Sequence, residues 1–246
     1  MDEGYSLSYH TLYKKHWWWR SREAAILDVL RALKPPQGFG WILDVGCGDG
    51  LFFDQLRAFG EAEGVESSAA LLDPNGRHRA SIHLAPFDSG FQPKRRYGLV
   101  LMLDVLEHLP DPGAALRHAL RLSEPSGKIV ITVPAFNLLW TTHDDLNHHL
   151  VRYTKSSFAR VARDSGLRID LARYWYQWGF LAKLALRSVE KISGTTPSNP
   201  SIPPAPINLA LYLLSRAEQR VFTHVPAPLG SSLLIVGSHC GAGLSD

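Results

Sequence analysis

The stretch Leu43-Asp44-Val45-Gly46-Cys47-Gly48-Asp49-Gly50 decides the fold of this chain. Residues 41–45 form a short apolar run that ends at closely spaced glycines, which predicts a buried strand followed by a tight turn. Glycine allows the backbone to turn sharply and to approach a ligand closely. A helix is predicted after the loop, and the amides at a helix N-terminus favour an anionic group. The stretch therefore predicts a strand, loop and helix that bind a ligand.

Strands and helices alternate through the first two thirds of the chain. Apolar, β-branched and alternating segments predict strands at residues 41–45, 63–66, 81–85, 97–103, 128–133, 168–174 and 231–238. Helical periodicity and end signals predict helices at residues 17–33, 51–59, 112–122, 155–165, 180–192 and 207–222. Residues 125–127 read as a turn, and the Pro/Ser-rich residues 193–206 as irregular. The alternation predicts an α/β fold whose mainly parallel sheet binds ligands beyond the carboxyl ends of its strands.

Composition narrows the class of protein. The 246 residues suit one sizeable α/β domain, and 26 basic against 23 acidic residues give a net charge of only +3. With no long basic run, nucleic acid is not an expected partner. Two cysteines cannot form a disulfide framework and are typical of a reducing compartment. The first ten residues lack a signal-peptide pattern and no apolar stretch reaches 18 residues, so we expect a cytoplasmic protein without a transmembrane segment.

Carboxylates at the strand ends separate two cofactor chemistries. Asp44 would repel a pyrophosphate but suits the ammonium group of an amino acid, and Leu51 stands where a nicotinamide-type GxGxxG motif needs its last glycine. Glu66, about twenty residues on, can accept both hydrogen bonds of a ribose diol. Asp88 can either accept a bond from an adenine amino group or cap the turn at residues 88–90. A plain glycine-rich turn and a solvated carboxylate are the alternatives for the loop and for Glu66.

These segments together resemble a known family. LDVGCGDG, GVE, FD and LDVLEHL resemble, in order and spacing, the class I S-adenosylmethionine-dependent methyltransferases over roughly residues 41–135. The flanking HWWWRSR, RYT and PLGSSL are similar to those of small-molecule methyltransferases. The resemblance implies a Rossmann-like, doubly wound, seven-stranded sheet that is mostly parallel, with an antiparallel last strand and a helical insertion before it. Gly98 departs from the family, which usually has an acidic residue at that point of the fourth strand.

The resemblance implies S-adenosyl-L-methionine as cofactor and S-adenosyl-L-homocysteine as product. Its expected cofactor contacts are Asp44, Gly46, Cys47, Gly48, Glu66, Ser67, Asp88, Leu103 and Asp104. In the family, the segment after the fourth strand lies beside the reactive methyl group, which would place His108 towards the acceptor. A histidine there is a candidate general base because its pKa lies near neutrality. The alternative is that Glu107 and His108 form a structural pair that opens a helix.

The His- and Asp-rich loop at residues 143–153 follows the fifth strand and is predicted to contact the acceptor. The expected substrate contacts are Asp144, His148, Arg152 and Tyr153. A metal site is not expected, because no recognised ligand spacing is present. The alternative is a surface loop held by its own hydrogen bonds.

We expect one methyltransferase domain over residues 1–246, divided into four parts. These are an N-terminal lid or helix at 1–34, a cofactor-binding core at 41–175, a helical insertion or cap at 176–226 and a final strand at 227–240. Trp17, Trp18 and Trp19 cannot share one helical face, so they suit either a lid over the cofactor or packing of the first helix. The apolar insertion suits a cap over an apolar acceptor, peripheral membrane contact, or a helical hairpin packed on the core.

The function predicted from the sequence is direct methyl transfer from S-adenosylmethionine to a small-molecule or lipid-like acceptor. A non-catalytic S-adenosylmethionine-binding module of the same fold is one alternative, and an NAD-linked oxidoreductase is another. The sequence does not distinguish O-, N- and C-methylation, since the shared motifs serve the cofactor and the variable loops serve the substrate. It leaves the oligomeric state open.

Overall fold

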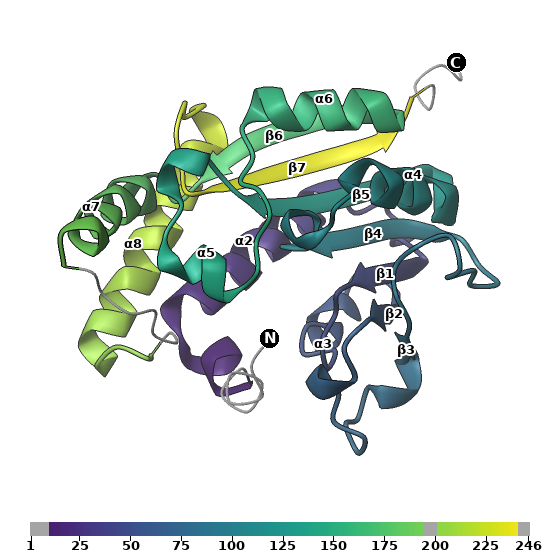
Figure 1. Cartoon of the computed structure of the whole chain (residues 1–246). Coiled ribbons are helices and arrows are strands. Elements are labelled where there is room, and N and C mark those ends of the chain that lie inside the picture. The colour runs from purple at the N-terminus through teal and green to yellow at the C-terminus, as the bar shows by residue number, and fades with distance from the viewer. Residues whose placement is uncertain (1–9, 194–200, 241–246) are drawn as a thin grey trace. The chain divides into compact units, whose positions relative to one another are not determined.

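The computed structural model describes residues 10–193 and 201–240, which contain one seven-stranded sheet. Its strands are β1 (Trp41–Val45), β2 (Glu61–Glu66), β3 (Ile82–Leu84), β4 (Tyr97–Leu103), β5 (Ser123–Pro134), β6 (Leu167–Trp175) and β7 (Ser232–His239). The strand order is β3-β2-β1-β4-β5-β7-β6 (Figure 1). The fold class predicted from the sequence is therefore confirmed.

Strand β1 occupies the centre of the parallel part of the sheet. It pairs in parallel with β2 on one side and with β4 on the other, and β2–β3 and β4–β5 also pair in parallel. Strand β7 lies between β5 and β6 and runs opposite to β4 (Figure 1). The direction of the strand order reverses between β1 and β4. That reversal is the switch point where open α/β sheets bind ligands, at the carboxyl ends of the strands.

The helices begin and end mostly where sequence signals place them. They are α2 (Trp17–Leu33), α3 (Phe53–Leu56), α4 (Pro112–Leu122), α5 (Thr142–Leu146), α6 (Lys155–Ser165), α7 (Gln177–Ser193) and α8 (Ala205–His224). Residues 10–15 are also helical. Asp111 caps α4 by accepting a hydrogen bond from the Ala114 amide, and Gly166 ends α6 with a left-handed φ of 81°. None of the described helices is both long and apolar enough to cross a membrane.

Three local predictions need correction. The helix expected at 51–59 shrinks to α3, because the chain on both sides of it is held by tight turns, such as the bond from the Phe53 amide to the Gly50 carbonyl. The turn expected at 125–127 lies within the bounds of β5, at an irregularity where the register with β4 shifts from the Tyr97–Ser123 pair to the Leu99–Lys128 pair. The irregular stretch expected to reach residue 206 ends earlier, since α8 begins at Ala205. Residues 194–200 lie outside the described residues.

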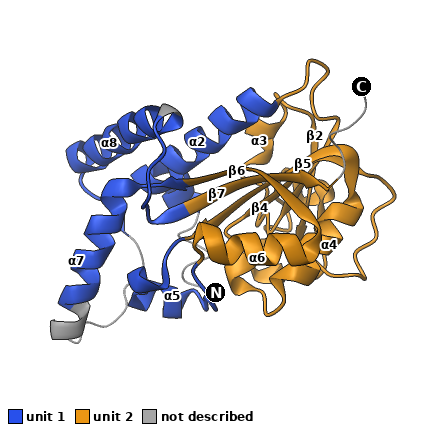
Figure 2. Ribbon diagram, turned by 90° about the horizontal axis from the view of Figure 1, so that it is seen from above, with its two compact units in different colours: residues 1–33, 135–152, 174–232 blue, residues 34–134, 153–173, 233–246 orange. Residues whose placement is uncertain are grey.

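The chain forms two compact units (Figure 2). Unit 1 consists of residues 1–33, 135–152 and 174–232, and unit 2 of residues 34–134, 153–173 and 233–246. Unit 2 has the sheet as its core, with the side chains of Leu99–Met102 on β4 fully buried. Helices α4 and α6 of unit 2 lie side by side (Figures 1 and 2).

Unit 1 brings together segments that are far apart in the sequence. Helix α2 packs along α8, and the Trp17 amide donates a hydrogen bond of 2.8 Å to the Asn208 side chain. The Trp17 ring lies 5.3 Å from the Trp178 ring, and the Trp18 ring stacks 6.5 Å from that of Tyr176. The tryptophan cluster thus packs within unit 1 against the start of the region expected to be an insertion.

Close backbone packing explains the unusual Gly98 in β4. A Cβ at this position would lie 2.1 Å from the carbonyl oxygen of Phe39, a distance that real side chains do not reach. The clash would be with backbone, which cannot swing aside as the end of a side chain can. The absence of the acidic residue that is usual in the family therefore follows from the path of the segment before β1.

We predict that Gly98→Ala destabilises the protein by about 1–3 kcal/mol, the usual cost of overpacking a core. Urea unfolding followed by circular dichroism measures this change. Gly113→Ala in α4 is the matched control, because its added Cβ would meet only side-chain atoms at 3.3 Å. The control should remain within about 0.5 kcal/mol of the wild type or gain stability. Equal stability of the two variants would contradict the packing argument.

Candidate active site

The glycine loop after β1 has a backbone that only glycine adopts readily. Gly46, Gly48 and Gly50 have φ values of 69°, 52° and 70°, in the left-handed region. The Gly46 amide donates to the Val65 carbonyl at 2.8 Å, which fastens the loop to β2. A Cβ added at Gly48 would meet nothing within 4 Å. The backbone at Gly48 is therefore open to a ligand.

Glu66 holds this loop from the end of β2. Its side chain is buried, one carboxylate oxygen accepts a hydrogen bond from the Gly48 amide at 3.1 Å, and the other accepts from the Ser68 amide at 2.8 Å. A carboxylate has about four acceptor positions, so these two bonds leave capacity for further donors. The two amides fix its orientation beside the open backbone. Ser67, the next residue, is exposed.

Three carboxylates give the loop a negative environment. Burial, and then the charges of Asp44, Glu66 and Asp49, raise the pKa of the Cys47 thiol well above its usual range. The thiol therefore stays protonated and is not a nucleophile. Cys47 instead packs over Gly64, where an added Cβ would lie 2.3 Å from the sulfur atom. The same negative charge acts on any ligand of the loop, so the loop suits a cationic group and disfavours a pyrophosphate.

Asp44 and Asp49 occupy buried positions on either side of the loop's first turn. Asp44 lies in β1, paired with Gly64 of β2 and Leu101 of β4, and is 5% exposed. Asp49 is 9% exposed and accepts a hydrogen bond of 3.1 Å from the Asp73 amide, which ties the loop to the segment after β2. The sequence motif alone did not indicate a role for Asp49. Its position between two glycines of a binding loop was the available signal.

Asp88 caps a turn in the structure. Its carboxylate accepts a hydrogen bond from the Gly90 amide at 2.8 Å, and its carbonyl accepts from the Phe91 amide at 3.1 Å. This is the turn-capping geometry that the sequence left as an alternative to adenine contact. The side chain is exposed. The two roles remain compatible, because a capping carboxylate keeps further acceptor positions.

The carboxyl end of β4 carries the candidate base and its support. Leu103 is half-buried at the end of the strand, and Asp104 follows with a left-handed φ of 57°. Asp104 exchanges two bonds with Thr132 of β5: its amide donates to the Thr132 carbonyl at 2.9 Å, and its carboxylate accepts from the hydroxyl at 3.0 Å. His108 lies at the end of the 3₁₀ helix η3 (Leu106–His108), with an exposed side chain.

Tyr153 holds η3 through a hydrogen bond. Its side chain is 3% exposed, and its hydroxyl donates to the Leu106 carbonyl at 3.3 Å. Burial, and then the negative charge of the fully buried Glu107, raise the pKa of Tyr153 to about 12. At neutral pH Tyr153 is a neutral hydrogen-bond donor, and it positions the segment that carries His108. The sequence did not reveal the burial of Glu107, because burial follows from packing rather than from the motif.

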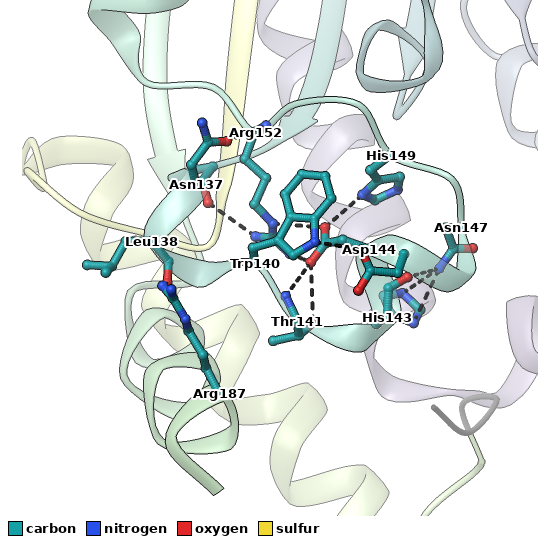
Figure 3. Close-up of polar contacts among 12 residues, drawn as sticks. Asn137, Leu138, Trp140, Thr141, His143, Asp144, Asn147, His149, Arg152 and Arg187 are labelled. Atoms are coloured by element: carbon teal, nitrogen blue, oxygen red, sulfur yellow. Dashed lines mark hydrogen bonds and ion pairs between the residues drawn. The ribbon is translucent and has the colours of Figure 1, made fainter. Parts of the chain in front are cut away.

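In unit 1, Asp144 and Arg152 form a buried ion pair (Figure 3). The two are 0% and 2% exposed, and two nitrogens of the guanidinium each lie 2.8 Å from a different carboxylate oxygen. Arg152 also donates to the Ala135 carbonyl at 3.2 Å. Asp144 further receives bonds from the Thr141 amide and from His149, at 2.9 and 2.8 Å. The pair therefore joins the C-terminal end of the loop to α5 at its start.

The charges in this loop are set by these contacts. Burial by itself would raise the pKa of Asp144, but the hydrogen bonds from His149 and Arg152 hold it well below its usual range. Burial, and then the charge of Lys183, lower the pKa of His143 to about 4. Of the predicted substrate contacts in this loop, Asp144 and Arg152 are engaged with each other. His148 differs, since its side chain is exposed and its φ of 56° is left-handed.

The predicted cofactor residues fall together only in part. Gly46, Gly48 and Glu66 are joined by the hydrogen bonds of one loop, and Asp104 follows the strand next to β1. Asp88 follows β3 at the edge of the sheet. Among the predicted substrate contacts, Asp144 and Arg152 meet in unit 1, whereas Tyr153 belongs to unit 2.

Comparisons with known proteins agree with this geometry. A family model described as a methyltransferase domain matches residues 17–172. A ubiquinone biosynthesis O-methyltransferase of Rhodopseudomonas palustris is 30% identical over 125 residues, which cover 48% of this chain and 46% of that relative. The match therefore spans less than half the length of the curated relative.

Two solved structures share the fold. The TehB-like SAM-dependent methyltransferase of Corynebacterium glutamicum has a TM-score of 0.55 at 15% identity, and the match covers 97% of this chain and 100% of the other. An S-adenosylmethionine-dependent methyltransferase of Clostridium acetobutylicum has a TM-score of 0.57 at 9% identity, with 89% and 92% covered. The chain belongs to the class I S-adenosylmethionine-dependent methyltransferase family. S-adenosylmethionine is the cofactor of that family.

The buried pair in unit 1 gives a stability prediction. Asp144→Asn leaves the Arg152 guanidinium buried without a counter-charge, so the free energy of unfolding should fall by about 3–5 kcal/mol at pH 7. Chemical denaturation of the two single variants and of Asp144→Asn/Arg152→Gln forms a double-mutant cycle. We expect a coupling of about 1–3 kcal/mol, with the double variant less destabilised than the sum of the singles. Strict additivity would show that the two groups do not act as a pair.

The same pair predicts a pH dependence. The pKa of Asp144 is below its ordinary 3.8 in the folded state, so its contribution is fully present above that pH and is lost as the pH falls through the folded-state pKa. The stability difference between wild type and Asp144→Asn should therefore stay constant from about pH 8 to about pH 5 and shrink below about pH 4. Denaturation at several pH values measures it. A difference already lost at about pH 6 would mean that the Asp144 carboxylate is not the charged partner.

Proposed function

We propose that this chain transfers a methyl group from S-adenosylmethionine to an oxygen atom of a small, apolar or lipid-like acceptor. The observation that carries the proposal is the open glycine loop with Asp44, Asp49 and Glu66 around it. The O-methyltransferase name of the R. palustris relative supports oxygen as the accepting atom. The sulfonium supplies a methyl group that is already strongly electrophilic, so the protein has mainly to bind, orient and exclude water.

The cofactor's parts match the chemistry of the loop. The negative environment that raises the pKa of Cys47 favours the ammonium group of the amino acid and the sulfonium. The open backbone at Gly48 can be approached closely, and Glu66 has acceptor capacity for a ribose diol. The same charges oppose the pyrophosphate of a dinucleotide. We therefore assign Asp44, Gly46, Cys47, Gly48, Glu66, Ser67, Asp88, Leu103 and Asp104 to the cofactor, with Cys47 contributing its backbone.

A hydroxyl acceptor must lose a proton when it is methylated, and we assign His108 as the base that accepts this proton. Tyr153 and Cys47 have raised pKa values that leave them protonated, and the pKa of His143 is too low for a strong base. His108 is exposed on a segment held by the Tyr153 hydroxyl. An imidazole has the basicity that general-base catalysis needs near neutral pH.

The loop at residues 143–153 is proposed to hold the acceptor. The buried Asp144–Arg152 pair fixes the loop, and exposed His148 is the residue we assign to direct contact. Metal is not part of the proposal. A cytoplasmic location is proposed because Cys47 and Cys240 are both free thiols. A mild net charge of +3 gives no reason to include nucleic acid as a partner.

The first test concerns the cofactor. Glu66→Gln keeps the size of the side chain but replaces one acceptor oxygen by a donor, so affinity for S-adenosylhomocysteine should fall by about tenfold or more, as expected for a lost bond to a charged group. Titration calorimetry measures the affinity. Glu61→Gln is the matched control, since Glu61 is exposed at the other end of β2. Equal affinities in both variants would remove Glu66 from the site.

The second test concerns the proton. With radiolabelled S-adenosylmethionine and a panel of catechols and hydroquinones, His108→Asn should lower kcat by about 10²–10⁴-fold and remove the acidic limb of its pH profile. Affinity for S-adenosylhomocysteine should not change. His83→Gln, at an exposed histidine on β3, is the control. An unchanged kcat and pH profile in His108→Asn would assign the proton to another group. Cofactor binding without any methylated product in the wild type would favour the non-catalytic module.

A further inference from the structure

Helix α8 exposes an apolar stripe to solvent. Ile207, Leu209, Leu213, Leu214 and Val221 are 48–58% exposed. At 100° per residue these positions fall within one arc of the helix, together with exposed Ala210 and Ala217. A helix on the surface of a water-soluble domain normally turns such a stripe inwards. Here the stripe faces outwards.

The opposite side of α8 is polar and packs inside unit 1. Asn208, Ser215 and Gln219 are less than 10% exposed. The Asn208 amide group donates to the Lys15 carbonyl at 2.8 Å, while its oxygen accepts from the Trp17 amide. Arg216 bonds to Asp28 of α2 at 2.6 Å. These bonds fix the rotation of α8, so the apolar stripe cannot turn inwards without breaking them.

Helix α7 also exposes apolar side chains. Leu181, Leu186 and Val189 are 67%, 49% and 56% exposed. The basic side chains of Lys183 and Arg187 on the same helix are half-buried. The Arg187 guanidinium donates to the Leu138 carbonyl. Glu218 of α8 accepts bonds from the Gln177 and Trp178 amides and so joins α8 to the start of α7. Both helices of this region therefore present apolar side chains to the outside of unit 1.

Exposed basic side chains lie on and around α8. The Arg20 guanidinium is 4.6 Å from the centre of the Tyr212 ring of that helix. Lys14 and Lys15 are exposed in the segment before α2, where the Lys15 carbonyl accepts the bond from Asn208. Arg220 is exposed on α8 itself. The one acidic residue in the sequence of α8 is Glu218, whose carboxylate accepts hydrogen bonds from backbone amides at the start of α7. An apolar face of α8 that is bordered by Arg, and whose one acidic residue is bonded to backbone amides, is complementary to an anionic lipid surface.

We propose that α8, together with α7, docks on an anionic membrane surface, with the apolar stripe in the boundary between headgroups and acyl chains. The charges disfavour a second copy of the chain as the occupant. A symmetric dimer on this face would bring the same row of cations from both copies together. Lipid phosphates instead neutralise Lys14, Lys15, Arg20 and Arg220. This inference is independent of methyl transfer, and it would give the enzyme access to an acceptor dissolved in lipid.

Vesicle flotation tests the proposal with the full chain. Wild-type protein should float with vesicles of phosphatidylcholine that contain roughly 30% phosphatidylglycerol, which mimic a negatively charged leaflet. It should not float with vesicles of phosphatidylcholine alone. Leu209→Ser/Leu213→Ser should lower the partition coefficient by about tenfold or more, because apolar area that enters the membrane is lost. Leu84→Ser is the matched control, since Leu84 is 48% exposed on β3 and should leave binding unchanged.

A charge variant separates the two contributions. Lys14→Gln/Lys15→Gln/Arg220→Gln should remove the preference for phosphatidylglycerol while the apolar stripe remains. Circular dichroism and affinity for S-adenosylhomocysteine should match the wild type in every variant, which excludes misfolding. Wild-type protein that binds no vesicle overturns the proposal. So does equal flotation of the wild type and the Leu209→Ser/Leu213→Ser variant. A wild-type dimer that this variant converts to a monomer would assign the stripe to self-association instead.

Discussion

The hydrogen bond from the Gly48 amide to the Glu66 carboxylate joins the two strand ends on which the candidate cofactor site depends. Strand β1 can place its glycine loop beside the end of β2 because the two strands pair in parallel and in register. The left-handed φ of Gly48 directs its amide to Glu66, and the absence of a side chain leaves the backbone open. Glu66 is held in turn by the Ser68 amide. This one hydrogen bond therefore depends on the left-handed backbone of Gly48 and on the register of β1 with β2, and it orients a carboxylate of the candidate cofactor site.

Electrostatics gives this loop its selectivity. A glycine-rich turn at the switch point of a parallel sheet is shared by many nucleotide-binding folds, so the turn alone does not name a ligand. The carboxylates of Asp44, Asp49 and Glu66 all act to raise the pKa of Cys47, which shows that they impose one sign of charge on the loop. A positively charged amino-acid cofactor is favoured by that charge. A dinucleotide pyrophosphate is opposed by it.

Much of the fold could be predicted because local signals decide it. The bounds of α2, α4 and α6 follow from helical periodicity, the Asp111 cap and the Gly166 end signal. The errors arose where tertiary contacts override local preference. Residues 51–59 look helical by pattern, yet turn bonds beginning in the glycine loop shorten the helix to α3. Residues 125–127 look like a turn between two elements, but they lie within β5, at the point where its register with β4 shifts.

The candidate site was predictable to a similar degree. Motif order and the family resemblance singled out Gly48, Glu66 and His108; a hydrogen bond joins the first two, and the role of His108 stays a prediction. The pairing of Asp144 with Arg152 was not predictable, because it depends on how a loop folds back on α5. The rotation of α8 escaped prediction for the same reason. Its polar bonds to α2 and to the segment before it, rather than its hydrophobic pattern, decide which side faces solvent.

Titration calorimetry of the wild-type protein with S-adenosylhomocysteine and, separately, with NAD tests the central claim most directly. The account predicts saturable binding of S-adenosylhomocysteine and no measurable binding of NAD, because the carboxylates of the loop accept a cationic amino acid and repel a pyrophosphate. Binding of NAD without binding of S-adenosylhomocysteine would contradict it.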